Sequence, residues 1–479
     1  MMIFTTLVNR FTILSFTFLN MLVVSLPNGL KSKLAEVEIP LDSSPEKIRE
    51  AWGLADAGHL IEVALVWSNL QQLDPTTQFW IVRLWSPGLP IIEVILIWLY
   101  KVTSIPFSYF IIFFTILIWM ILFYLVVKNC RSKKAILTVF IIVNLYIHTF
   151  DFEWILRSGI FYTEGISIGL LLVGLTLYLQ ALIKNNRSIA TLVFAGVFVG
   201  FSIIVRHIID IPILFTLFIA TFLILVFNKR INVLKKELFS FDLRKGSIKL
   251  TKSKEKKIHS ANLTLLVSSE IKRTLIKVIT ILLIGLTVTI PWRLVAQQVY
   301  GSGPGVMSEA PRLTGKYLWV DDQTNSTFFW SPNGINWACK IDKIKCKEIN
   351  SNITSYTVSD LRNEAVKSAL FNPIKYASER FKYFSKYWQA ESNGFSLNSF
   401  ISWSILFLPF TWILMRKSIG LQKYFGVLVF SIPILFVLTG QLLIIHYESR
   451  YFIIIRMIIL WTTFGLFAIR DDKEAKIKI

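Results

Sequence analysis

Long apolar runs alternate with shorter polar segments along most of this chain of 479 residues. Each run covers about 17–24 residues, which is enough for a helix to cross the hydrocarbon core of a bilayer. Because lipid offers no hydrogen-bond partners, a spanning segment has to satisfy its backbone groups internally, as a helix does. The pattern predicts an all-α polytopic membrane protein with about ten transmembrane helices. The predicted spans are 11–27, 106–128, 134–150, 160–183, 189–205, 210–227, 274–292, 398–415, 423–441 and 451–469.

Basic residues are concentrated in some of the segments between these runs, and they orient the chain in the membrane. Short loops rich in Lys and Arg remain in the cytoplasm. Both termini are then cytoplasmic, and the alternate segments lie outside. The predicted cytoplasmic segments are 128–134, 184–187, 228–273, 416–423 and the tail from Arg470. The predicted outer segments are 28–105, 151–159, 206–209, 293–397 and 442–450.

This topology divides the chain into three parts. Residues 1–292 form an N-terminal transmembrane module, with a long first outer loop over 28–105 and a basic cytoplasmic loop over 228–273. Residues 293–397 form a long outer loop. Residues 398–479 hold the last transmembrane helices and a basic cytoplasmic tail.

Two segments of the outer loops are predicted to lie on the membrane surface. The apolar segment 88–102 would break the charge pattern if it crossed the bilayer, so we expect a juxtamembrane or re-entrant helix there. The stretch from Val358 to Trp388 places Phe, Tyr and Leu on one face and Lys and Arg on the rest. Such a pattern suits a helix that lies on the membrane surface or caps a site.

The composition fits a membrane protein and argues against a nucleic-acid partner. The chain is 54% hydrophobic and 14% aromatic, and its formal net charge is +21. A nucleic-acid-binding protein would interleave basic and aromatic residues on a soluble domain, whereas these basic residues lie in interhelical loops. Cys339 and Cys346 stand in the long outer loop. They can pair as a disulfide in an oxidising compartment or remain two free thiols.

A cluster of charged residues stands where two apolar runs meet water. Asp151, Glu153, Arg157 and Glu164 are close in the sequence. Ionisable groups at a membrane edge are costly and mark a functional site by default. The aromatic residues around them suit the headgroup zone of any membrane protein. The carboxylates can orient an acceptor, hold arginines or bind a divalent cation through oxygen ligands.

Two further outer turns carry candidate residues. Arg206 and His207 precede Asp210 in the third outer turn. Arg206 can bind a phosphate through its fork of donors, or it can pair with Asp210 at the interface. The last outer turn holds Glu448 and Arg450, which suit either an interfacial ion pair or a substrate contact.

The order of several short motifs resembles the GT-C superfamily of polytopic glycosyltransferases. It looks most like the group of the protein O-mannosyltransferases and the aminoarabinose transferases of lipid A. The motifs are an early acidic residue before a helix, a proline turn, a Thr-Glu helix start, a Gly-to-Arg turn, a Pro-Trp segment, an Asn-Pro helix and a Glu-x-Arg-Tyr turn. They lie at Asp42–Ala51, Trp85–Pro90, Tyr162–Gly165, Gly200–Arg206, Pro291–Arg293, Phe371–Pro373 and Glu448–Tyr451.

The resemblance implies a GT-C-like fold and a polyprenyl-phosphate sugar as the donor. The acceptor is a lipid, a glycan or a protein on the outer face of the membrane, here a bacterial plasma membrane. The family implies inversion at the anomeric carbon. A carboxylate would take the proton of the acceptor hydroxyl, and cations would offset the charge that develops on the leaving phosphate.

Asp42 is the predicted base, although its place before a helix-like stretch over 45–59 also suits an N-cap. Relatives carry an Asp-Glu pair and a tyrosine in this loop, where this chain has Ser43 and Glu46, so Asp56 is the alternative base. The predicted catalytic residues are Asp42, Glu153 and Asp151. The predicted substrate-binding residues are Arg206, Arg157, Glu164, His207, Glu448 and Arg450.

Two other functions compete with the glycosyltransferase. A transporter or flippase of lipid-linked glycans would show internal repeats and charges near the midplane. The sequence shows no repeat, and its charges cluster at the outer edge. A glycan polymerase or ligase also uses outer arginines, but it takes pyrophosphate-linked oligosaccharides as donors.

Overall fold

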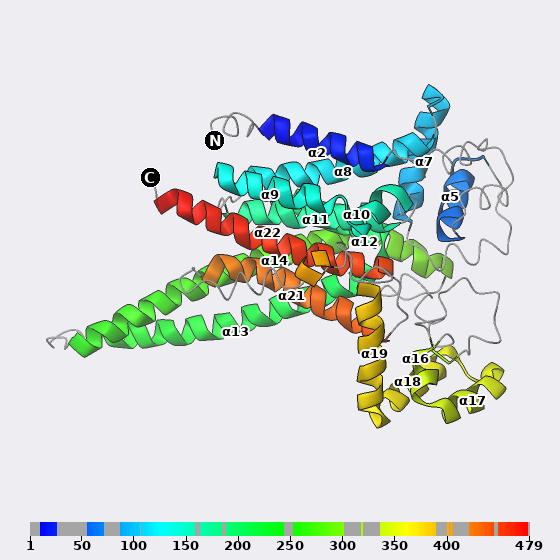
Figure 1. The fold of residues 1–479 in the computed structure, drawn as a ribbon. Coiled ribbons are helices and arrows are strands. Elements are labelled where there is room, and N and C mark those ends of the chain that lie inside the picture. The colour runs from blue at the N-terminus through cyan, green and yellow to red at the C-terminus, as the bar shows by residue number, and fades with distance from the viewer. Residues whose placement is uncertain are drawn as a thin grey trace.

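A computed structural model describes most of the chain, and its described residues are helical or lie in turns, with no strand among them (Figure 1). This agrees with the predicted all-α class. Described are residues 10–25, 55–70, 87–105, 107–158, 163–183, 188–243, 252–300, 318–319, 336–388, 400–401, 403–405, 421–444 and 449–477.

Among the residues that the structure describes, six helices contain segments long and apolar enough to cross a membrane. They mark the chain as a multi-pass membrane protein, whereas the predicted count of ten spans stays a prediction. Shorter apolar helices stand at two more predicted spans, α2 (Arg10–Ser25) and α12 (Ile189–Val205). The six long helices are α8 (Phe107–Asn129), α11 (Thr163–Ile183), α13 (Asp210–Leu243), α14 (Lys252–Tyr300), α21 (Leu421–Ile444) and α22 (Ser449–Ile477).

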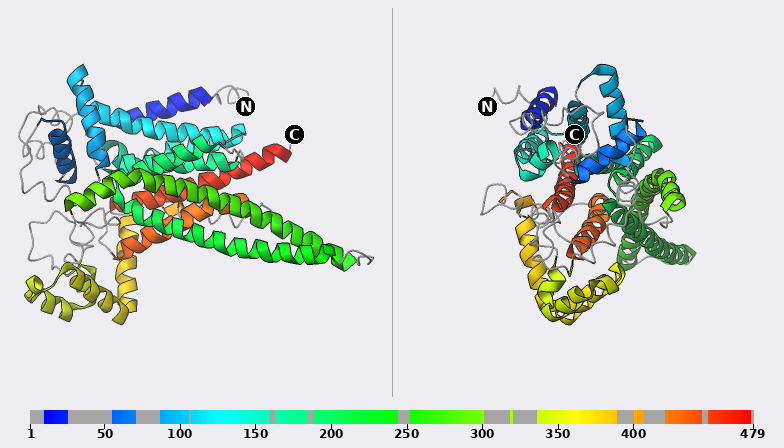
Figure 2. Two further views of the ribbon diagram at one scale, coloured as in Figure 1. Left: turned by 180° about the vertical axis from the view of Figure 1, so that it is seen from behind. Right: turned by 90° about the vertical axis from the view of Figure 1, so that its right-hand side faces the viewer.

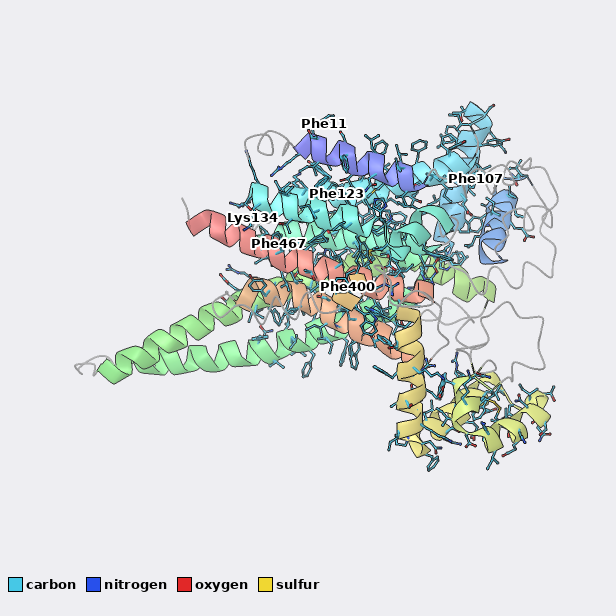
Figure 3. The ribbon with its side chains drawn as sticks, viewed as in Figure 1. Phe11, Phe107, Phe123, Lys134, Phe400 and Phe467 are labelled. Atoms are coloured by element: carbon cyan, nitrogen blue, oxygen red, sulfur yellow. A yellow bond between two sulfur atoms is a disulfide. The ribbon has the colours of Figure 1, made fainter. Side chains whose placement is uncertain are left out.

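The two chain termini lie at the same end of the helix bundle, which we call the terminal end (Figure 1). The turn from α8 to α9 (Lys133–Tyr146) lies there too, because Arg10 donates a hydrogen bond from Nη2 to the carbonyl oxygen of Cys130 at 3.3 Å. Figure 3 shows Lys134 at this end, at the start of α9. Basic segments far apart in the sequence therefore share one end of the bundle, as the charge pattern predicts.

The opposite end, which we call the distal end, carries helices that run across the bundle axis. The helices α7 (Gly88–Thr103) and α19 (Pro373–Trp388) lie steeply to the long helices in Figure 1 and in the reverse view of Figure 2. Helix α5 (Ala55–Trp67) contacts α7. The orientation of α7 fits the surface helix predicted over 88–102.

The amphipathic stretch predicted from Val358 to Trp388 is two helices. α18 (Val358–Phe371) is followed by its C-cap Asn372, and α19 begins at Pro373. Proline has no N–H to continue the preceding helix, but it fits the first turn of a new one. The chain therefore changes direction at Asn372.

The distal helices α16 (Trp337–Ile341), α17 (Lys343–Ser351), α18 and α19 form a small subdomain. Its core is a separate cluster around Trp319, Trp337, Ile349 and Leu361. Cys339 and Cys346 are joined by a disulfide, so the pairing that the sequence left open is present.

The main core lies in the bundle around α11, most of whose residues are buried between α8, α12 and α22. Helices α12 and α14 approach closely through glycines. A methyl group on Gly200 would stand 2.5 Å from the carbonyl oxygen of Gly285, and one on Gly196 would stand 2.6 Å from Ile284. These contacts fix which residues of α12 and α14 lie at the same depth.

Candidate functional site at the distal end

The segment predicted as the second outer loop is helical and buried. It forms α10 (Phe150–Glu153) and one π-helical turn (Trp154–Ser158). Asp151 is 1% exposed and accepts from Arg456 of α22, from Nε to Oδ2 at 2.8 Å and from Nη2 to Oδ1 at 2.5 Å. Tyr146 also donates its hydroxyl to this carboxylate. The prediction that 151–159 is a loop is therefore wrong as far as the structure describes it, because residues 151–158 are helical.

Arg456 connects this carboxylate to the distal subdomain. Its Nη1 donates to the carbonyl oxygen of Trp388 at 3.1 Å, and its guanidinium lies 5.4 Å from the centre of the Trp388 ring. Trp388 is the last residue of α19, where backbone carbonyls lack helical partners and the helix dipole favours a cation. The buried pair of Asp151 and Arg456 thus holds α10, α19 and α22 together.

Arg206 and Glu164 are brought together at the distal ends of α12 and α11. Arg206 follows the last residue of α12, and its Nη1 lies 2.9 Å from Glu164 Oε1 and 2.7 Å from Thr163 Oγ1. Glu164 is 2% exposed, whereas Arg206 keeps 14% of its side-chain surface exposed. A buried carboxylate therefore orients an arginine that still reaches the surface.

A second arginine is held in the same way on neighbouring helices. Arg293 of α14 donates from Nη2 to Asp210 Oδ1 at 2.5 Å and from Nε to Thr289 Oγ1 at 2.7 Å. Asp210 is 4% exposed and Arg293 is 11% exposed. The alternative that Arg206 pairs with Asp210 is therefore wrong, because each partners a different residue.

The register of α12 and α14 places the two arginines at about the same depth. Gly196 faces Ile281 and Ile284, and Gly200 faces Gly285 and Val288. Residues that face each other across the two helices therefore differ by 85 to 88 in residue number. By this offset Arg206 lies level with residues 291–294 of α14, which include Arg293. The backbone positions of two arginines, each of which contacts a carboxylate and a threonine hydroxyl, thus lie at about the same level of adjacent helices.

Glu93 of α7 is a buried acid that the sequence reading missed. It is 0% exposed, and neither carboxylate oxygen has a hydrogen-bond partner among the described residues. Burial raises the pKa of Glu93 well above its usual range, because a low-dielectric surrounding disfavours the charged form. Its helix packs by Gly88 against Val205, the residue before Arg206. A buried carboxylic acid with a raised pKa therefore belongs to the same end of the molecule as the two arginines.

An internal cavity of about 50 Å³ lies deeper in the bundle, beside Tyr146. It is lined mainly by apolar and aromatic side chains, among them Met21, Trp119 and Met457. Ligand pockets typically measure about 300–1,000 Å³ and hold a few convergent polar groups. This cavity is too small and too apolar for a sugar, so we place the candidate site at the distal end instead.

Several predicted site residues are either outside the described part of the chain or described by their backbone alone. Asp42 and Glu448 lie outside the described residues. Glu153, Arg157, His207, Arg450 and the alternative base Asp56 are described by their backbone, which is helical at each of them. Within the described part of the chain, no group of three or more His, Cys, Asp or Glu residues is arranged to hold a metal ion.

Two of the charged residues at the site carry a signal in the sequence itself. Arg456 is an arginine inside the predicted span 451–469, and an intramembrane charge is by itself a reason to look for a partner. Arg293 follows the Pro-Trp pair that closes another predicted span. Glu93 stands in an apolar segment, and its complete burial in the structure is what makes it a candidate for the site.

Comparisons with protein-family models, with curated proteins and with solved structures find no match to this chain. The class of the protein therefore rests on its own helices: it is a multi-pass helical membrane protein. Its activity has to be argued from the charged residues at the distal end.

Proposed function

We propose that this protein is an integral-membrane glycosyltransferase. It moves a sugar from a polyprenyl-phosphate donor to a lipid, glycan or protein acceptor at the distal end of the bundle. The observation that carries the proposal is the pair of arginines, Arg206 and Arg293, which the register of α12 and α14 places at about the same level and which buried carboxylates each hold in place. The resemblance of the motif order to the GT-C superfamily supports the same function.

The arginines suit the phosphate of the donor. The guanidinium of Arg presents planar donors that match phosphate oxygens, and fixing it in advance reduces the entropy lost on binding. Glu164 and Asp210 supply this fixation from the first turns of α11 and α13. Stabilising charge on the leaving group is among the largest contributions to catalysis, so these arginines would lower the barrier to sugar transfer.

The transfer itself is a displacement at the anomeric carbon. A bond forms between the acceptor oxygen and this carbon, while the bond to the phosphate oxygen breaks and its electron pair leaves with the lipid phosphate. Asp42 takes the acceptor proton, with Asp56 as the alternative base, and the anomeric configuration inverts. General base catalysis contributes on the order of 10²–10⁴-fold. Glu153 orients the acceptor or binds a divalent cation, and Arg157 and Arg450 are the alternatives to Arg206 as the cation that faces the leaving phosphate.

The site faces the outer side of a bacterial plasma membrane in this proposal. The disulfide between Cys339 and Cys346 supports it, since disulfides persist in oxidising compartments and are rare in the cytosol. The basic segments at the terminal end support it as well, because they favour the cytoplasmic side.

The function is tested by transfer of labelled sugar from polyprenyl phosphate in membranes that contain the purified protein. Arg206→Ala should lower turnover by about 10²–10³-fold, the effect of losing one donor to a developing anion. Arg206→Lys should recover part of the lost turnover, because the cation is kept. Asp42→Asn should also lower turnover, because it removes the proposed base. Lys367→Ala, an exposed change on α18, is the matched control and should keep full turnover. Unchanged turnover in both Arg206→Ala and Asp42→Asn would contradict the proposal.

The same preparation separates the alternatives. A flippase moves labelled lipid-linked glycan across the bilayer and forms no new glycosidic bond. A polymerase or ligase accepts pyrophosphate-linked oligosaccharides and leaves monophosphate donors intact. Transfer from the monophosphate donor supports the proposed function against both.

A further inference from the structure

Helix α19 has two faces with different surroundings. Tyr376 and Arg380 pack on Trp337 of α16, with a ring contact at 5.0 Å and a guanidinium contact at 5.5 Å. At 100° per residue, Ile374 and Phe381 lie on another side of the helix. They are 86% and 69% exposed, so α19 presents bulky apolar side chains away from its own subdomain.

The apolar surface continues around the corner between α18 and α19. Leu370 and Phe371, the last residues of α18, are 74% and 83% exposed. Soluble surfaces rarely place several large apolar side chains side by side, and such patches mark interaction sites or membrane contact. Together with Ile374 and Phe381 these residues form a patch that we call the α19 patch.

The position of α19 indicates what covers this patch. The helix runs across the distal end of the bundle and projects beyond its edge (Figures 1 and 2). Helix α21 ends nearby, and Ile432 and Phe436 on it are exposed, as apolar side chains on the outside of a membrane-spanning helix are. A helix that leaves the bundle sideways at this level runs along the bilayer surface.

A basic residue lies beside the α19 patch. Lys382 is exposed and follows Phe381 in α19, about 100° further around the helix axis. A lysine beside an apolar stripe extends its ammonium group to the headgroups while its methylene chain lies along the interface. Lys375, the residue after Ile374, instead donates to the carbonyl oxygen of Ile341 at 3.0 Å and ties α19 to α16.

We propose that α19 is a phospholipid-binding helix that lies on the bilayer surface, with Ile374 and Phe381 in the interface and Lys382 on lipid phosphate. An amphipathic helix of this kind buries its apolar face about 5–10 Å into the boundary of headgroups and acyl chains. The bilayer then positions the C-terminus of α19, where the Trp388 carbonyl accepts from Arg456. Lipid contact outside the bundle would thereby support the buried pair of Arg456 and Asp151.

The test uses a fluorescent probe on single cysteines in the full-length protein. Ile374→Cys and Phe381→Cys are made with Cys130→Ala, since Cys130 is the free cysteine among the described residues. Ile344→Cys is the matched control, because Ile344 is as exposed as Ile374 but lies on α17, far from the bundle (Figure 1). Each protein is labelled with bimane and reconstituted in phosphatidylcholine nanodiscs, with or without phosphatidylglycerol.

Nitroxide-bearing lipid should quench the probes at 374 and 381 and shift their emission to the blue, while aqueous iodide should quench the probe at 344. Lys382→Gln should weaken lipid quenching at 381 by about fivefold in nanodiscs with phosphatidylglycerol, the effect of one basic charge near an anionic surface. Quenching of all three probes by iodide alone would overturn the proposal. Cross-linking at position 381 between two copies of the chain would also overturn it, because another protein would then cover the patch. The readout involves no sugar transfer, so it stands or fails separately from the proposed function.

Discussion

At the residue scale, the buried charges of this protein divide into two kinds. Arg456 and Asp151 are enclosed in the bundle, where a charge is tolerated because it is paired and hydrogen-bonded. Arg206 and Arg293 are paired as well, but each keeps part of its surface exposed at the distal end. The enclosed pair is suited to holding helices together, whereas the exposed arginines are suited to binding an anion.

Removing one member of the enclosed pair should destabilise the protein more than removing both. Arg456→Met leaves Asp151 buried without its cation, and such a loss costs about 3–5 kcal/mol. The double variant Asp151→Leu with Arg456→Met should recover most of this, because apolar side chains replace both charges. Thermal unfolding in detergent, followed by the tryptophan fluorescence, compares the wild type, the two single variants and the double variant. A double variant as unstable as the sum of the single variants would contradict this account.

Glu93 should make stability depend on pH. Its folded-state pKa is raised by burial, so between the unfolded pKa of about 4.3 and the folded value the native state binds more protons than the unfolded state. Stability should therefore fall as pH rises through that window. Glu93→Gln removes the ionisation, and it should flatten the profile and raise stability at neutral pH. Melting temperatures measured from pH 5 to pH 8 test this, and identical slopes for wild type and variant would count against it.

At the element scale, close helix contacts depend on single small residues. Helices α12 and α14 approach through Gly196, Gly200 and Gly285, and this contact sets the register that brings Arg206 level with Arg293. Small residues at such crossings let helix backbones approach in a membrane, where packing rather than the hydrophobic effect drives association. The geometry of the candidate site thus depends on positions that contact no charged group.

Gly200→Ala should separate α12 from α14. The added methyl group would stand 2.5 Å from the carbonyl oxygen of Gly285, and overpacking of this kind costs about 1–3 kcal/mol. Gly440→Ala on α21 is the control, because nothing lies within 4 Å of the added atom. The free energy of unfolding of this control should stay the same or rise by about 0.5–1 kcal/mol, because alanine is a better helix former than glycine. Equal melting temperatures for the two variants would show that the α12–α14 contact can relax.

At the scale of the whole molecule, the bundle has one basic end and one end covered by surface helices. The terminal end holds both chain termini and the α8–α9 turn, and the distal end holds α5, α7 and the disulfide-linked subdomain. The candidate arginines lie at the distal end. Function and topology are therefore linked, because the side that the distal end faces decides which substrates can reach it.

The two ends should be reached from opposite sides of the membrane. Lys133→Cys lies at the start of α9 on the terminal end, and Ser355→Cys lies in the distal subdomain; both positions are exposed. In a Cys130→Ala background, a membrane-impermeant maleimide added to intact cells should label position 355 and leave position 133 unlabelled. Labelling position 133 in intact cells would invert the predicted topology.

The positions of several helices could be read from the sequence with small errors. The predicted span 160–183 is α11 from Thr163, and the predicted span 189–205 matches α12 at both ends. Apolar runs are a local property, and a helix in lipid forms within its own segment. The sequence also shows that charged residues gather at the membrane edge, and it predicts both Glu164 and Arg206 as substrate-binding residues. What the sequence could not supply was which charges meet.

Only the tertiary structure decided the partners of the charged residues. Asp151 pairs with Arg456, which is 305 positions away in the sequence. Asp210 pairs with Arg293 and not with Arg206, four residues before it. The physical reason is that a hydropathy pattern depends on the neighbours of a residue along one helix, whereas an ion pair depends on which helices pack together and in which register. The sequence by itself thus determined that helices cross a membrane and where charges border it, and the packing of α10, α11, α12, α14 and α22 determined what those charges can do.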